Sequence, residues 1–148
     1  MNFVALAPFL IIFAACLTPL QPLVNAKLNQ HVDSPIWVSF ISFASGTIIL
    51  LILGLIINGK FMTLETEGLK WWMFISGLIG ATYVTFSLLA VPHLGAATLA
   101  VIATGTVLIV SGLLDHFGVL SEAPHPINLQ KFCGMVLLAI AVLITMKA

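Results

Sequence analysis

The sequence of 148 residues contains very little charge and no arginine. Only 7% of its residues are charged, whereas soluble domains carry about 25%. Five lysines balance five acidic residues, so the formal net charge is zero. This composition excludes the basic surface with which nucleic-acid-binding proteins attract phosphates, and we expect no nucleic-acid partner.

The sequence also lacks the residue groups that metal sites and enzyme active sites require. Cys16 and Cys133 stand far apart within apolar segments, so we interpret them as small packing residues rather than as metal ligands or a disulfide pair. The chain has no glycine-rich nucleotide loop, no paired carboxylates within its apolar segments and no histidine cluster at ligand spacing. We therefore expect neither an enzyme nor a bound metal or cofactor.

Long uncharged segments occupy most of the chain instead. Residues 71–114 contain no Asp, Glu, Lys or Arg, and residues 1–26 and 34–59 are also uncharged. A bilayer core is about 30 Å thick, and a helix needs about 20 apolar residues to cross it. The sequence therefore predicts an all-α, polytopic membrane protein that forms one integral-membrane domain over residues 1–148.

Turn signals divide the chain into five predicted transmembrane helices, at about 3–25, 35–58, 70–91, 95–115 and 129–146. Ser34 and Pro35 suit the start of the second helix, and Asn58-Gly59 suits its end. Pro92-His93-Leu94-Gly95 predicts a tight hairpin between the third and fourth helices. Residues 2–15 contain no Lys or Arg, so we expect a retained first helix rather than a signal peptide.

The fifth predicted helix is the shortest. The uncharged segment between Lys131 and Lys147 has a length of about 22 Å at ~1.5 Å per residue. It spans the bilayer if both lysines extend to the interface. If it were only interfacial, the chain would have four spans.

Two prolines and three amides make the first helix unusual. Pro19 and Pro22 each remove a backbone donor and favour a kink. Gln21, Asn25 and Asn29 follow at four-residue spacing, so they line one face if the helix continues. Helices interrupted by proline and carrying polar side chains are typical of transport sites. The alternative is that the helix ends near Pro22 and the amides lie among lipid headgroups.

Small and hydroxyl-bearing residues recur inside the other helices. Lipid provides no hydrophobic drive for helix association, so small residues at helical spacing predict close packing, either within the protomer or across a dimer. Threonine often bonds its own helix backbone, whereas a buried tyrosine hydroxyl usually seeks another partner. The small residues are Ser39, Ser42, Gly46, Ser76, Gly80, Gly105 and Gly112, and the other polar ones are Tyr83, Thr85, Thr104 and Thr106.

Asp115 directly adjoins an apolar segment, and His116 follows it. An ionisable residue at the bilayer centre costs about 2.5–3.5 kcal/mol and normally has a partner or a function. The uncharged residues 94–114 already cross the core, which places Asp115 at an interface. We interpret Asp115 and His116 as a helix-end anchor, with proton coupling or gating as the alternative.

The lysines give almost no orientation signal. One predicted side of the membrane holds Lys60, Lys70 and Lys131, and the other holds Lys27 and Lys147. Cytoplasmic loops normally carry the excess of basic residues. One interpretation is a fixed orientation with a modest bias. The other is dual topology with an antiparallel homodimer, because many transporters combine two inverted repeats.

A series of short motifs runs along nearly the whole chain. In their order and spacing these motifs resemble the YdcZ family of the drug/metabolite transporter (DMT) superfamily. The motifs are Asn25-Ala26-Lys27-Leu28, Ser34-Pro35, Ser42-Phe43, Gly46-Thr47, Trp71-Trp72, Gly77, Gly80, Tyr83-Val84-Thr85, Pro92-His93-Leu94-Gly95-Ala96-Ala97-Thr98 and Asp115-His116-Phe117-Gly118.

The resemblance implies an EamA/DMT-like unit of five helices, equivalent to half of a ten-helix transporter. It also implies a bacterial inner-membrane location and a dimer. The family usually has Gly-Gln where this chain has Gly105-Thr106, so a smaller hydroxyl replaces an amide. The candidate substrate-binding residues are Gln21, Asn25, Ser42, Tyr83 and Thr106.

The favoured function is secondary transport of a small neutral, zwitterionic or lipophilic metabolite or drug. A homodimer would work by alternating access, with a site near the midplane lined by the first, third and fourth helices. A channel-like dimer for a small solute and a non-transporting accessory membrane subunit are the alternatives. The expected partners are the lipid bilayer, a second copy of the chain and a small-molecule substrate.

Overall fold

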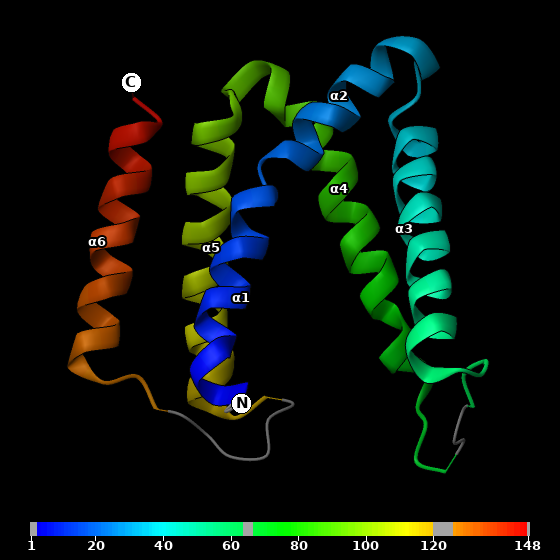
Figure 1. Ribbon diagram of the computed structural model, residues 1–148. Coiled ribbons are helices and arrows are strands. Elements are labelled where there is room, and N and C mark those ends of the chain that lie inside the picture. Colours follow the sequence, from blue (N-terminus) through cyan, green and yellow to red (C-terminus); the bar gives the residue numbers. More distant parts are fainter. Residues whose placement is uncertain (1–2, 64–66, 120–125, 148) are drawn as a thin grey trace. The chain divides into compact units, whose positions relative to one another are not determined.

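The computed structural model describes residues 3–63, 67–119 and 126–147, and these ranges contain helices and no strand (Figure 1). The predicted all-α class is therefore confirmed. The chain divides into two compact units, Met1–His93 and Leu94–Ala148, and each is described by itself. The helices are α1 (Phe3–Leu17), α2 (Leu20–Val32), α3 (Pro35–Asn58), the short 3-10 helix η1 (Trp71–Phe74), α4 (Ile75–Leu94), α5 (Ala96–Phe117) and α6 (Leu129–Thr145).

The first predicted helix is interrupted between α1 and α2. Pro19 and Pro22 lack an N–H group, so the carbonyls of Ala15 and Thr18 lose their usual donors four residues ahead. The backbone N–H of the residue before each proline donates to that carbonyl instead. The Thr18 N–H donates to the Ala15 carbonyl at 3.2 Å, and the Gln21 N–H donates to the Thr18 carbonyl at 3.4 Å. The helix therefore does not end near Pro22, and the amides that follow remain helical.

The bounds predicted for the second helix agree with α3. Pro35 is its first residue, and Ser34 occupies the N-cap position without a capping bond from its side chain. Gly59 ends the helix at φ 67°, where its N–H donates to the Leu55 carbonyl at 3.0 Å. Glycine suits this position because it has no Cβ to clash in the left-handed region. The 24 residues of α3 have a length of about 36 Å at ~1.5 Å per residue.

The connection between α4 and α5 is shorter than predicted. Pro92 and His93 lie inside the last turn of α4, and Gly95 alone separates Leu94 from Ala96. Gly95 has φ 75°, a conformation that residues with a Cβ rarely adopt. The third predicted helix also starts differently, because η1 precedes α4 at its N-terminal end.

In the Leu94–Ala148 unit, α5 packs against α6 through two glycines. A Cβ added at Gly105 would lie 2.7 Å from Val142 Cγ2, and one at Gly112 would lie 3.0 Å from Met135 Cε. The close packing predicted for these glycines is therefore confirmed. At the start of α6, the Asn128 side chain caps the helix by accepting from the Lys131 N–H at 2.8 Å.

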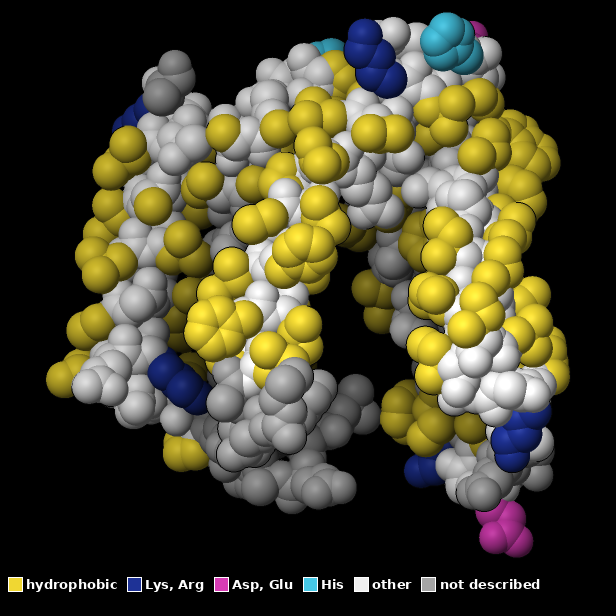
Figure 2. Space-filling view, in the orientation of Figure 1, with side chains coloured by type: hydrophobic (Ala, Val, Ile, Leu, Met, Phe, Trp, Pro, Cys, Tyr) yellow, Lys and Arg dark blue, Asp and Glu magenta, His cyan; other side chains and the backbone are white. Residues whose placement is uncertain are grey.

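Four helical segments in the described ranges are long and apolar enough to cross a membrane. They are Leu6–Val32, Pro35–Asn58, Trp71–Leu94 and Ala96–Phe117. The last helix, α6, has 17 residues and a length of about 26 Å, so it is shorter than a usual span of about 20 residues. Figure 2 shows hydrophobic side chains along the helices, with Lys, His and acidic side chains near helix ends. This exposed apolar surface is the kind that faces lipid.

Candidate functional site

Among the described residues of the Met1–His93 unit, three polar ones are almost fully buried. Asn25 and Ser39 are each 4% exposed, and Ser87 is 5% exposed. A buried polar group in an apolar environment costs free energy unless it forms a hydrogen bond. Ser87 meets this need within its own helix, because its hydroxyl donates to the Val84 carbonyl at 3.0 Å. Asn25 and Ser39 instead lie between helices: Asn25 between α2 and α3, and Ser39 between α3 and α4.

Asn25 joins α2 to α3. Its Nδ2 donates to Ser42 Oγ at a distance of 3.4 Å. This distance is longer than the usual 2.7–3.2 Å for such a bond, so the contact is weak. A weak bond between two neutral groups is easily exchanged for a bond to a ligand.

Ser39 joins α3 to α4 through a shorter contact. Ser39 Oγ and Thr85 Oγ1 are 2.7 Å apart. Each hydroxyl also lies within bonding distance of its own helix: Ser39 Oγ is 2.9 Å from the Pro35 carbonyl, and Thr85 Oγ1 is 2.8 Å from the Ala81 carbonyl. Two hydroxyl protons cannot satisfy three such contacts at once, since each hydroxyl has one proton to donate. One contact therefore always lacks its proton, and the pair can rearrange.

Asn29 lies one helical turn after Asn25 on α2. Its Oδ1 atom is buried and has no hydrogen-bond partner among the described residues. Buried acceptors without partners are rare in native proteins. This carbonyl is a suitable acceptor for a ligand that carries an N–H or O–H group. We call Asn25, Asn29, Ser39, Ser42 and Thr85 the polar seam.

The structure brings together two of the predicted substrate-binding residues, Asn25 and Ser42. Gln21 also belongs to α2 but is exposed. Tyr83 on α4 is 47% exposed, and no hydrogen bond joins its hydroxyl to another described residue. These two residues therefore belong to the same compact unit as the polar seam but not to its buried contacts.

The other predicted residues belong to the Leu94–Ala148 unit. Thr106 is exposed on α5, where its hydroxyl donates to the Ile102 carbonyl at 2.9 Å. Asp115 and His116 are exposed in the last turn of α5. His116 Nδ1 accepts from the Ile127 N–H at 3.3 Å, so it links the end of α5 to the residues that precede α6. Roles for these three residues in binding or coupling stay predictions.

Sequence reasoning missed the joint role of Ser39 and Thr85. It treated Ser39 as a small packing residue and Thr85 as a hydroxyl that bonds its own backbone, and both descriptions are correct locally. The available signal was the spacing of Ser39 and Ser42, which are three residues apart and share one face of α3. The partner on α4 lies 46 positions away in sequence and leaves no local pattern.

In the described ranges, no three His, Cys, Asp or Glu side chains come together as a metal site. The polar seam is a set of neutral amides and hydroxyls on α2, α3 and α4, and such groups can bind a ligand through hydrogen bonds.

Comparison with known families identifies the chain. The family model described as "Putative inner membrane exporter, YdcZ" matches residues 6–144. The chain belongs to the YdcZ family. No curated protein matches it, and no solved structure matches it. With its apolar helices, this YdcZ protein is a multi-pass protein of the inner membrane and a transporter, which is not an enzyme class.

Proposed function

We propose that this YdcZ protein exports a small neutral, zwitterionic or lipophilic metabolite or drug across the bacterial inner membrane. The observation that carries the proposal is the polar seam, in which hydrogen-bonding side chains pair between α2 and α3 and between α3 and α4. The export direction follows the description of the family. A homodimer working by alternating access is part of the proposal.

The chemistry of the polar seam favours a substrate without net charge. Its five residues offer amides and hydroxyls and no carboxylate or ammonium group. An ion without a charged partner would be strongly disfavoured in a low-dielectric site. The unpartnered Asn29 carbonyl favours a substrate that donates a hydrogen bond.

The same contacts supply the means of switching between states. The Asn25–Ser42 bond is weak, and the two hydroxyl protons of Ser39 and Thr85 serve three contacts. Both sets of contacts can therefore break and re-form at low cost. The interruption between α1 and α2 adds a place where the chain bends, as in transporters with discontinuous helices. Substrate binding would replace contacts within the polar seam and shift the populations of two states.

An antiparallel homodimer would supply the second half of the transporter. Transporters commonly combine two inverted repeats around a central site, and this chain has one set of helices. Its nearly balanced lysines, three against two between the predicted sides, do not favour one orientation strongly.

A flux experiment tests the transport proposal. Purified protein in liposomes is assayed with a panel of neutral, zwitterionic and lipophilic compounds. The variants Asn25→Leu and Ser42→Ala are then assayed with the same panel. We expect saturable flux and counterflow for at least one compound, and a loss of at least ten-fold in both variants. The matched control is Thr82→Val, since the exposed Thr82 hydroxyl bonds its own helix, at the Leu78 carbonyl.

Three results would contradict the proposal in different ways. Unitary conductance without counterflow would indicate a channel. No flux across the panel, with stable co-purification of a larger membrane protein, would indicate an accessory subunit. Equal losses of flux in Asn25→Leu and Thr82→Val would show that transport does not depend on the polar seam.

A topology experiment tests the antiparallel arrangement. Fluorescent-protein and alkaline-phosphatase fusions at the C-terminus report cytoplasmic and periplasmic locations, respectively. Strong signals from both fusions are expected for dual topology. A strong signal from one fusion alone would rule out an inverted pair made from this chain.

A further inference from the structure

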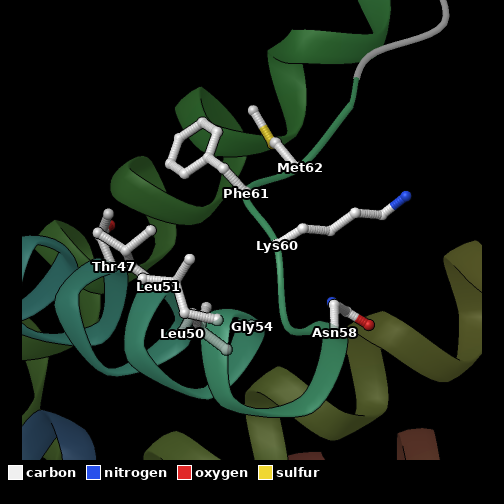
Figure 3. A pocket seen from close by; sticks show the side chains of 9 residues that line it. Thr47, Leu50, Leu51, Gly54, Asn58, Lys60, Phe61 and Met62 are labelled. Carbon is white, nitrogen blue, oxygen red and sulfur yellow. The ribbon is translucent and has the colours of Figure 1, made fainter.

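An open cleft of about 490 Å³ follows the C-terminal half of α3. One wall is the helix itself, and the other is the segment that leaves it (Figure 3). Its volume lies within the range of about 300–1,000 Å³ that is usual for ligand sites. The lining residues are Thr47, Leu50, Leu51, Gly54, Leu55, Asn58, Lys60, Phe61 and Met62.

The walls of this cleft are mostly apolar, and they remain open within the chain. Phe61 and Met62 lie in the segment that follows α3, and their side chains are 63% and 75% exposed. A Cβ added at Gly54 would meet no atom within 4 Å, so the space beside this glycine is empty. Such a surface on a membrane-length helix is suited to contact with a hydrocarbon chain.

The cleft has the length of one lipid leaflet. From Thr47 to Asn58 the helix rises about 16 Å at ~1.5 Å per residue. This rise is about half of the ~30 Å hydrocarbon core. A single acyl chain lying along α3 would therefore reach from the helix end to the middle of the bilayer.

A cation lies at the end of the cleft where a headgroup would be. Lys60 follows the helix terminus at Asn58 and Gly59, and its side chain extends away from Leu50 and Leu51 in Figure 3. None of the lining residues is acidic. A lysine ammonium attracts phosphate as a point charge, and its aliphatic stem tolerates the apolar side of the interface.

We propose that this cleft binds an anionic phospholipid, with one acyl chain along α3 and the phosphate at Lys60. The apolar walls, the length of one leaflet and the terminal cation together match this amphiphile. The proposal concerns a lipid held at the surface of the protein and is independent of which substrate it transports.

Native mass spectrometry of the full chain in mild detergent tests the proposal. The probes are phosphatidylglycerol and phosphatidylcholine with identical acyl chains. We expect phosphatidylglycerol to be retained with about a five-fold preference, which is the effect of one basic residue beside an anionic lipid. Lys60→Gln should abolish this preference, whereas Lys27→Gln should leave it unchanged.

A second pair of variants tests the acyl-chain half of the cleft. Gly54→Leu places a side chain in the space beside Gly54, where an added Cβ meets no atom within 4 Å, and should reduce retention of both lipids several-fold. Gly46→Leu is the matched control, because a Cβ there also meets nothing within 4 Å and Gly46 does not line the cleft. Thermal unfolding of each variant verifies that the fold is intact.

Four outcomes would overturn the proposal. Equal retention of the two lipids by the unaltered protein would remove the role of charge. A preference that survives Lys60→Gln would place the headgroup elsewhere. Equal effects of Gly54→Leu and Gly46→Leu would show that the cleft is not the lipid site. A change of oligomeric mass in Gly54→Leu, without a change in bound lipid, would assign the cleft to a second copy.

Discussion

Substitution of Gly105 by alanine should weaken the packing of α5 against α6. Gly105 is buried, and the added Cβ would lie 2.7 Å from Val142 Cγ2, closer than real side-chain contacts allow. Valine is branched at Cβ and holds one preferred rotamer in a helix, so its methyl group cannot rotate away easily. The backbones of the two helices must therefore move apart.

The size of the effect follows from two opposing contributions. Replacing glycine by alanine inside a helix stabilises it by roughly 0.5–1 kcal/mol. Overpacking of a well-packed contact costs typically about 1–3 kcal/mol. We therefore expect Gly105→Ala to lower the free energy of unfolding by up to about 2.5 kcal/mol.

Two further glycines on helices provide internal controls. Gly112→Ala places a Cβ 3.0 Å from Met135 Cε, the end of a flexible side chain that can move aside, so a change near zero is expected. Gly46→Ala enters open space on α3 and should stabilise the protein by roughly 0.5–1 kcal/mol. The predicted order of stability is Gly46→Ala, Gly112→Ala, Gly105→Ala.

The assay is reversible unfolding in mixed micelles, followed by circular dichroism. A double-mutant cycle with Val142→Ala isolates the clash, because removal of the Val142 methyl groups should make Gly105→Ala harmless. Equal shifts for Gly105→Ala and Gly46→Ala would refute the reasoning. So would a cycle without coupling between residues 105 and 142.

Three other predictions concern hydroxyl, amide and carboxyl side chains. Thr85→Val should destabilise the protein by about 0.6 kcal/mol, the mean value of an interhelical hydrogen bond in a membrane, whereas Thr82→Val should not. Equal unfolding midpoints for the two variants would contradict the Ser39–Thr85 contact. Asn29→Leu should leave unfolding unchanged or raise its free energy, because it removes an unpartnered buried acceptor, while flux falls; unchanged flux would exclude Asn29 from the binding site. Asp115→Asn should retain transport driven by a pH gradient, because Asp115 is exposed at the end of α5; loss of that transport in a folded variant would assign proton coupling to this residue.

The sequence alone determined the membrane location, the helical class and most of the helix order. These properties depend on local composition, since an uncharged segment of sufficient length must form a helix in lipid to satisfy its own backbone. The start of α3 at Pro35, its end at Gly59 and the close packing at Gly105 and Gly112 were predicted for the same reason. Each is encoded by residues adjacent in the chain or by regular spacing on one helix.

The tertiary structure alone decided which polar groups meet. Apolar residues cover every side of α3 and α4, so the period of hydrophobicity does not tell which face of each helix packs. The pairing of Ser39 with Thr85 depends on that rotation, and no sequence pattern specifies it. The continuation of α2 beyond Pro22 also depended on replacement hydrogen bonds that only the folded backbone supplies. The cleft beside Gly54 is formed by α3 and the segment that leaves it, which is a property of the folded chain rather than of its composition.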